Sequence, residues 1–362
     1  MKFIRESLRD KKEYVVADHA GKGYKRMHQN EGLPWPEAFL TALDEQWETV
    51  KSQRPIHNYP PLSLEPLRMA TANLHHISEN QIEIFSGSSE ALTVLVTACA
   101  ETGRSICFPS PSFSLYKELV SQAGAEPVPL RLNSKSEYSD KELFSDKTKE
   151  ASAIFLCSPN NPTGTLLEIE RIEKLLNHTD ALVVVDEAYF EFAEANGAVS
   201  SLSLLKKYEN IVVLRTLSKA WSAPSLRIGF AFGNPDVISV LRALRPPYSV
   251  TTYSFYSALF ILQHGFQDMK ARVKVVLSER KRLEDELKKL GIDTYPSEAN
   301  FIFFHFDQAV ELEEYLRTQK KILIRIWPET PKRKASVRLS ICDSLTNTDF
   351  LQAFQEFLND NQ

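Results

Sequence analysis

The stretches AIFLC (153–157), LVVVD (182–186) and IVVL (211–214) decide the fold of this 362-residue chain. Each run is apolar throughout rather than alternating, which is typical of strands buried on both faces of a parallel sheet. Between the first two runs, LEIERIEKLL (167–176) has the apolar spacing of a helix. Because this alternation is that of β-α-β units, it predicts a mainly parallel sheet between helices from about residue 80 to 235.

A different pattern begins near residue 268, where the charge-laced amphipathic segment MKARVKVVLSERKRLEDELKKL ends at Gly291. Its spacing predicts one long helix, and the short strand-like and helical segments after it indicate an α+β arrangement. The chain is also longer than one core usually supports. We therefore expect an α/β protein in three parts: an N-terminal arm (1–35), a large domain (36–255) and a smaller α+β C-terminal domain (256–362), with an interdomain helix at about 268–290.

Bulk properties exclude several functions. A net charge of -4 and a sequence pI near 6.1 give no general attraction for nucleic acid or anionic lipid. The N-terminus lacks the apolar stretch of a signal peptide, and the longest apolar run (91–100) is too short to span a bilayer. Cysteines fall singly in apolar segments, which favours buried thiols over disulfides: Cys99, Cys107, Cys157 and Cys342. We expect a cytoplasmic protein with no metal, nucleic-acid partner or membrane partner.

Hydroxyl and glycine residues precede one helical run. Gly87, Ser88 and Ser89 lead into ALTVLV, where the free N–H groups of a helix N-terminus suit a phosphate. An ordinary N-cap is the alternative interpretation. Phe113 follows the strand predicted near residue 106, and it either faces a site or packs in the core.

Polar residues also follow the three deciding strands, at the edge where parallel sheets bind ligands. SPNNPTG (158–164) presents an amide, LVVVD ends at Asp186, and IVVL leads through TLSKAW, which contains Lys219. Arg227 stands eight residues beyond that lysine. Taken singly, each of these features has an ordinary explanation: SPNNPTG as a plain turn, Asp186 as a helix cap and Lys219 as a solvated cation.

Taken together, SPNNPTG, then VDEAY, then TLSKAW with Arg227 resemble the fold-type I aminotransferases of class I/II, which depend on pyridoxal 5'-phosphate (PLP). The resemblance runs from about residue 57 to the C-terminus. VDEAYFEF, LRTLSKAW and RPPY (245–248) are similar to the histidinol-phosphate aminotransferase branch. The resemblance implies the fold-type I PLP-transferase architecture. It also implies a role in amino-acid biosynthesis, with an amino group passing between an amino acid or histidinol-phosphate-like amine and a 2-oxo acid such as 2-oxoglutarate.

The same resemblance implies roles at the cofactor. Lys219 would hold PLP as a Schiff base and move a substrate proton, while Asp186 would pair with the pyridine nitrogen. Asn161 and Tyr189 would hydrogen-bond the ring oxygen, and Phe113 would stack on the ring. The phosphate would be bound by Gly87, Ser88, Ser89, Thr216, Ser218 and Arg227, joined by Tyr59 from a neighbouring subunit. A homodimer with shared active sites follows from that last assignment.

On the substrate side, the resemblance implies that Arg338 binds the α-carboxylate of an amino acid or the phosphate of histidinol phosphate. Arg325 would be a second anion-binding arginine, for which a rim ion pair is the alternative. Asn300 and Tyr248 would also face the substrate. We interpret the basic run Lys332 to Lys334 as a solvated loop.

The chain departs from the family in two places. The arm has Asp18 and Asn30-Glu31-Gly32-Leu33 where the family carries Tyr-x-Pro-Gly and Asn-Glu-Asn-Pro, and a carboxylate there would repel a substrate phosphate. Trp327 stands where the family has an acidic residue, so an aromatic amino acid is an alternative substrate. A decarboxylase or lyase resembling threonine-phosphate decarboxylase is the alternative activity. A DNA-binding regulator is disfavoured, because only about 35 irregular residues precede the expected large domain and no basic helix is apparent among them.

Overall fold

The structure is a computed structural model that describes residues 3, 5, 8, 21, 23–330 and 334–360. Its larger sheet has seven strands in the order β2-β8-β7-β6-β5-β3-β4. Their bounds are β2 (Ile82–Phe85), β3 (Ser105–Ser110), β4 (Glu126–Arg131), β5 (Ala153–Cys157), β6 (Leu182–Asp186), β7 (Ile211–Thr216) and β8 (Gly229–Gly233). The pairings from β7 through β6, β5 and β3 to β4 are parallel, which confirms the expected mainly parallel sheet, whereas β8 runs antiparallel to both neighbours.

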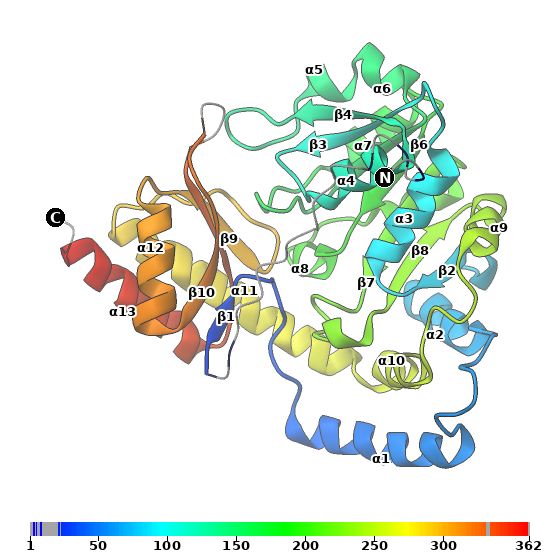
Figure 1. Ribbon diagram of the computed structural model, residues 1–362, viewed down its shortest axis with the longest axis horizontal. Helices are drawn as coiled ribbons and strands as arrows, with labels where there is room; N and C mark the ends of the chain where they lie inside the picture. Colours follow the sequence, from blue (N-terminus) through cyan, green and yellow to red (C-terminus); the bar gives the residue numbers. More distant parts are fainter. Residues whose placement is uncertain are drawn as a thin grey trace.

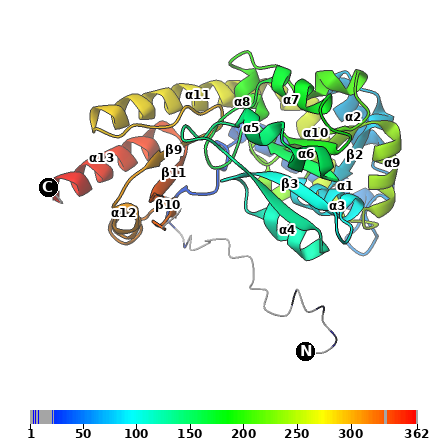
Figure 2. The same cartoon turned by 90° about the horizontal axis from the view of Figure 1, so that it is seen from above.

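Helices cover both faces of this sheet (Figures 1 and 2). The strand runs are apolar throughout because successive residues pack into hydrophobic cores on opposite faces of the sheet. In β6, Val184 packs in one core, and Val183 and Val185 pack in the other. One face carries α3 (Ser88–Cys99), α4 (Leu115–Ala123) and α9 (Pro235–Leu244). The opposite face carries α2 (Glu65–His75), α7 (Ile169–Leu176) and α10 (Thr252–His264).

The shorter elements of this region are α5 (Asp140–Leu143), α6 (Asp146–Glu150) and α8 (Phe190–Glu194), with 3-10 turns η2 (Glu79–Gln81), η3 (Ser201–Lys206) and η4 (Pro224–Leu226). Helix α1 (Glu37–Gln53) lies at the periphery below α10 in Figure 1. The long amphipathic helix expected from the sequence is α11 (Phe266–Lys289), which reaches from the region of the large sheet to that of the small one.

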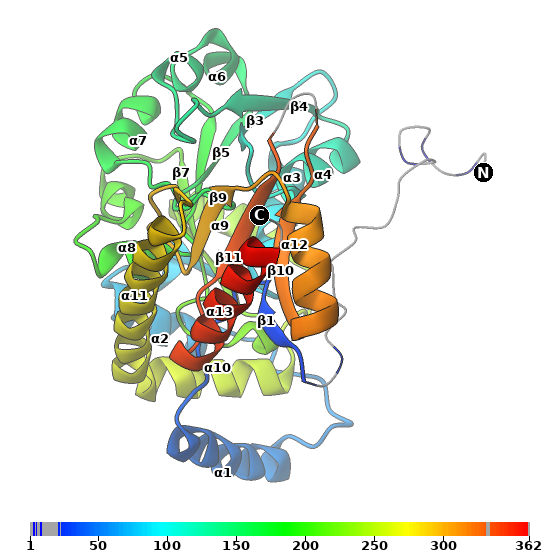
Figure 3. The ribbon, with the colours of Figure 1, turned by 90° about the vertical axis from the view of Figure 1, so that its left-hand side faces the viewer.

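The smaller sheet has four strands in the order β1-β10-β11-β9. They are β1 (Lys25–Met27), β9 (Phe301–His305), β10 (Ile322–Trp327) and β11 (Ser336–Ser340). Residues 25–27, which the sequence analysis places in an arm, pair in parallel with β10 at the sheet edge. Figure 3 shows α12 (Ala309–Tyr315) and α13 (Ser344–Asp360) on the outer face of this sheet, and the π-helical turn η5 (Leu316–Lys320) follows α12.

The two faces of the smaller sheet differ in chemistry. Phe304, Val337 and Ile324 are buried in the core that includes Phe350 and Phe354 of α13. The alternate positions point the other way and include Phe303, Arg325 and Arg338, of which Arg338 reaches Asn161 at the edge of the larger sheet. Among the residues that the structure describes, no helix has the length and apolarity needed to cross a membrane.

Candidate active site

The carboxyl ends of β5, β6 and β7 form the centre of the site. Cys157, the last residue of β5, is aligned with Asp186, the last residue of β6, and Asp186 is aligned with Leu214 of β7. Because parallel strands bring the same ends together, the turns that follow them meet at one edge of the sheet. The sequence-predicted Asn161, Asp186 and Lys219 are all placed on or just beyond these ends.

Asp186 is a buried carboxylate whose hydrogen-bond donors in the described part of the chain are neutral. The hydroxyl of Tyr116, from α4, donates to Oδ2 at 2.8 Å, and the backbone N–H of Ala188 donates to Oδ1 at 3.2 Å. Burial raises the pKa of the Asp186 carboxyl to about 6. Such a group can take a further partner that carries positive charge, and the protonated nitrogen of a pyridine ring is a partner of this kind.

Lys219 presents its amine on the same edge. Its Nζ lies 5.6 Å from the centre of the Tyr189 ring and donates to the carbonyl oxygen of Gln29 at 3.0 Å. Burial and the nearby guanidinium of Arg338 lower the pKa of the amine to about 7. At neutral pH a substantial fraction of the amine is therefore unprotonated and able to attack a carbonyl.

Arg338 joins the two sheets at this point. It lies on β11 of the smaller sheet, and its Nη1 donates to Oδ1 of Asn161 at 2.6 Å, while Nη2 donates to the carbonyl of His28. The Nδ2 of Asn161 in turn donates to the hydroxyl of Tyr189 at 3.4 Å. The predicted anion-binding arginine thus lies within two hydrogen bonds of a predicted cofactor-side tyrosine.

A cradle for an anion lies beside the first turn of α3. Gly87 has a φ of +80°, and a Cβ there would lie 2.3 Å from Nη2 of Arg227, so only glycine leaves room for the guanidinium. Nη1 of Arg227 donates to Oγ of Ser218 at 3.4 Å, and Thr216 Oγ1 donates to the same oxygen at 3.0 Å. Backbone donors, hydroxyls and a permanent cation therefore converge, as phosphate binding requires. Ser88 and Ser89 open the helix at this position.

Three further predicted residues lie around this centre. Phe113 contacts the Tyr116 ring edge-on at 5.6 Å, next to the Asp186 pair. Asn300 donates to the carbonyls of Asn30 and Glu31 at 3.1 and 3.2 Å. Arg325 is the cross-strand neighbour of Arg338, so the two predicted anion-binding arginines are adjacent.

Two predicted tyrosines lie apart, at the surface. Tyr59 is 75% exposed and Tyr248 is 40% exposed, and their rings stack on one another at 4.7 Å. Asp18, Lys332 and Arg333 lie outside the described residues, whereas Lys334 is exposed. The interpretation of Lys332 to Lys334 as a solvated loop is therefore supported at Lys334 alone.

Several residues of the site escaped the sequence analysis. His28, Gln29 and Asn30 belong to the arm, and Tyr116 lies inside a helical pattern. The arm is polar and aperiodic, so no local signal marked His28 and Gln29, and Asn30 was compared with the Asn-Glu-Asn-Pro turn of the family without being given a role. Tyr116 carries one detectable signal, namely a phenol on the buried face of a helix, where its hydroxyl needs a partner.

The amine, the carboxylate and the anion cradle fit the three functional ends of PLP. Lys219 suits its aldehyde, Asp186 suits its ring nitrogen, and the cradle with Arg227 suits its phosphate. The close approach of Gly87 to Arg227 is a feature that a merely structural turn does not require. In the described part of the chain, no group of three or more His, Cys, Asp or Glu side chains could hold a metal ion.

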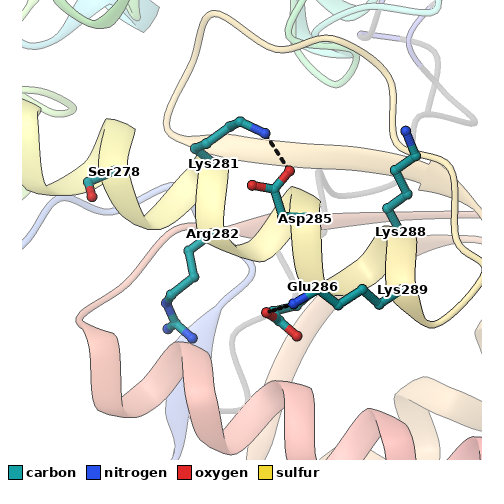
Figure 4. A pocket seen from close by; sticks show the side chains of 7 residues that line it. All are labelled: Ser278, Lys281, Arg282, Asp285, Glu286, Lys288 and Lys289. Carbon is teal, nitrogen blue, oxygen red and sulfur yellow. Dashed lines mark hydrogen bonds and ion pairs between the residues drawn. The ribbon is translucent and has the colours of Figure 1, made fainter.

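A hollow beside α11 lies apart from these residues (Figure 4). Its lining residues are Ser278, Lys281, Arg282, Asp285, Glu286, Lys288 and Lys289. Lys281 pairs with Asp285, and Lys289 pairs with Glu286 at 2.7 Å, so these charges are compensated within the helix. We interpret the hollow as a solvated helix face.

Known proteins resemble the chain over nearly its whole length. The sequence model of the family "Aminotransferase class I and II" matches residues 25–354. Histidinol-phosphate aminotransferase of Caldanaerobacter subterraneus subsp. tengcongensis is 31% identical over 360 residues, covering 99% of both chains. Aromatic amino acid aminotransferase of Cutibacterium acnes is 33% identical over 312 residues, covering 85% of this chain and 87% of the relative.

A solved structure agrees on the fold. The histidinol-phosphate aminotransferase of Sinorhizobium meliloti, determined in complex with pyridoxal-5'-phosphate, superposes with a TM-score of 0.83 at 20% identity, covering 94% of this chain and 92% of the other. The architecture of both sheets is therefore shared with a fold-type I enzyme.

Proposed function

The chain belongs to the class I and II aminotransferase family and is a PLP-dependent transaminase, and we propose that Lys219 is its reactive amine. The proposal is supported chiefly by the presence of two unusual ionisable groups, Asp186 and Lys219, at the ends of neighbouring strands. Among the residues that the structure describes, the hydrogen-bond donors to the buried Asp186 carboxylate are neutral, and Lys219 has an amine whose pKa is lowered to about 7. A surface lysine and a helix-capping aspartate would have neither property.

When bound, PLP supplies an aldehyde for amine capture and a cationic ring that delocalises the electron pair released at the substrate α-carbon. Asp186 keeps the ring nitrogen protonated by placing a negative charge beside it. Lys219, once displaced by the substrate amine, would take the proton from the substrate α-carbon and deliver it to the aldehyde carbon of the cofactor, C4'. Tyr189 and Asn161 hold the ring oxygen, and Arg338 orients the substrate through its carboxylate.

The substrate is proposed to combine a flat ring with an anionic group. Arg325 and Arg338 lie directly opposite one another, an arrangement of like charges that an anion between them would relieve. The Trp327 ring lies 5.7 Å and 5.8 Å from the two guanidinium groups, and Phe303 meets it edge-on at 5.9 Å. Histidinol phosphate and aromatic amino acids both have this combination, with a 2-oxo acid such as 2-oxoglutarate as amino acceptor.

We further propose a cytoplasmic homodimer with shared active sites. Ile56, Tyr59, Leu62 and Tyr248 are exposed large hydrophobic residues that a partner subunit would cover. The described cysteines are all free thiols, as suits a reducing compartment.

Half-reaction spectroscopy tests the activity. We expect phenylalanine, tyrosine or histidinol phosphate, added alone to the PLP-loaded enzyme, to convert the pyridoxal absorbance to that of pyridoxamine, and 2-oxoglutarate to reverse the change. Lys219→Ala should abolish the conversion, while Lys206→Ala, at an exposed position, should not. Release of carbon dioxide without pyridoxamine formation would overturn the transaminase assignment in favour of a decarboxylase.

A further inference from the structure

The arm segment His28–Glu31 crosses the candidate active site with its four carbonyl groups as hydrogen-bond acceptors. The carbonyl of His28 accepts from Arg338, and the carbonyl of Gln29 accepts from Nζ of Lys219 at 3.0 Å. The next two carbonyls accept from Nδ2 of Asn300 at 3.1 and 3.2 Å. Four consecutive carbonyls therefore meet side chains that were predicted to serve catalysis or substrate binding.

Asn30 is the residue that holds this segment in place. It is 1% exposed and has a φ of +53°, a left-handed conformation that asparagine tolerates better than most residues. Its backbone N–H donates to Oγ of Ser340 at 2.8 Å, and that hydroxyl donates to Oδ1 of Asn30 at 2.9 Å. The remaining group, Nδ2, donates to the hydroxyl of Tyr189 at 3.1 Å.

The bonds to Tyr189 determine where its proton points. The phenol oxygen accepts one N–H from Asn30 and a second, at 3.4 Å, from Asn161. A phenol has a single proton and otherwise accepts hydrogen bonds. Because both amides present N–H donors to the oxygen, the O–H is directed away from both amides and is available to a third group.

We propose that Asn30 is a positioning residue, which turns the Tyr189 hydroxyl into a hydrogen-bond donor toward the cofactor ring oxygen. This rests on the proposed function, in which PLP occupies the site. Charged or titratable groups also surround Tyr189 and Lys219 from β5, β6, β11, the residue after η4 and the arm: Cys157, Asp186, Arg338, Arg227 and Glu31. A change confined to Asn30 leaves all of these in place.

An aspartate at position 30 reverses the donor and acceptor of the hydrogen bond with Tyr189 and keeps the shape of the side chain. A carboxylate can only accept, so in Asn30→Asp the Tyr189 proton turns toward residue 30 and away from the ring oxygen. That oxygen then loses stabilisation as an anion, and the Schiff-base nitrogen holds its proton to higher pH. Asn30→Ala removes the donor without supplying an acceptor, so a smaller rise follows.

The pH midpoint of the cofactor's visible absorbance measures this effect independently of turnover. We expect the midpoint to rise in the order wild type, Asn30→Ala, Asn30→Asp. Relative to the wild type, Asn30→Asp should shift it by about one pH unit, which is roughly a tenfold change in proton affinity. Asn177→Asp is a matched control, because Nδ2 of Asn177 donates to the hydroxyl of Tyr208 at 2.9 Å on the exposed surface. It should leave the midpoint unchanged.

A double-variant comparison separates positioning from a general disturbance of structure. In a Tyr189→Phe background, Asn30→Asp should shift the midpoint little further, since the hydroxyl is already gone. An equal shift in both backgrounds overturns the proposal, as does Asn30→Asp shifting no more than Asn30→Ala. If Asn30→Asp does not fold, Ser340→Ala, which loosens Asn30 without adding charge, should raise the midpoint moderately, and an unchanged value overturns the proposal. Failure of the wild type to acquire a visible cofactor band would instead contradict the proposed function.

Discussion

Replacement of Asp186 by asparagine should stabilise the cofactor-free protein while removing its activity. Burial raises the pKa of this carboxyl from 3.8 to about 6, so the folded state binds its proton more tightly than the unfolded state does. Each pKa unit corresponds to about 1.4 kcal/mol, which makes the ionised carboxylate cost about 3 kcal/mol of folding free energy above pH 6. Asparagine avoids that cost but weakens one hydrogen bond, worth about 1 kcal/mol, leaving a gain of about 2 kcal/mol.

The pH dependence gives the sign of the effect. Because the folded pKa of Asp186 is the higher one, wild-type stability falls as pH rises from about 4 to about 6 and is then flat with respect to this group. The contribution of Lys219 is common to both proteins, so it largely cancels in their difference. The advantage of Asp186→Asn should therefore be small at pH 4.5 and nearly complete at pH 8.

Urea unfolding of the two apoproteins at both pH values measures this difference. Asp180→Asn, at an exposed aspartate, is the control and should change stability little at either pH. The reasoning would be refuted if the stability advantage of Asp186→Asn were equal at both pH values, or if the wild type were more stable than this variant at pH 8. Adding PLP should reverse the order, because the cationic ring then pairs with the wild-type carboxylate.

Three further substitutions test other parts of the molecule. Gly87→Ala should weaken PLP binding by roughly tenfold or more, because the added Cβ would lie 2.3 Å from Nη2 of Arg227, and equilibrium dialysis with unchanged affinity would contradict the cradle. Arg338→Lys should raise KM for the 2-oxo acid by roughly ten- to a hundredfold, since lysine cannot bind a carboxylate in a bidentate fashion; steady-state kinetics with unchanged KM would exclude it as the anchor. Arg215→Met leaves Glu187, its 2.8 Å partner, charged and buried, so urea unfolding should show a loss of about 3 to 5 kcal/mol.

The residues at the ends of the central strands were predictable because their signals are local. An uninterrupted apolar run identifies a strand buried on both faces, and parallel pairing brings successive carboxyl ends to one edge. The positions of Asn161, Asp186 and Lys219 at that edge follow from this reasoning, whereas their roles at a cofactor came from the resemblance of the combined motifs to a known family. The antiparallel direction of β8 was not predictable, since a five-residue apolar run looks the same in either direction.

Contacts across long sequence separations required the tertiary structure. Arg338 reaches Asn161 across 177 positions, and Asn30 reaches Ser340 across 310. Each pair depends on how the smaller sheet packs on the end of the larger one, and no local pattern in the arm records that geometry.

The sequence by itself therefore determined the mainly parallel sheet and the positions of Asn161, Asp186 and Lys219 at its edge, because backbone propensity and apolar periodicity act over a few neighbouring residues. The roles of these residues at the cofactor came from the family resemblance and stay predictions. Only the tertiary structure showed which distant groups form hydrogen bonds with Lys219 and with Tyr189 beside it. A hydrogen bond between distant segments depends on the packing of whole elements, and that packing placed the carbonyl of Gln29 on Lys219 and the side chain of Asn30 on Tyr189.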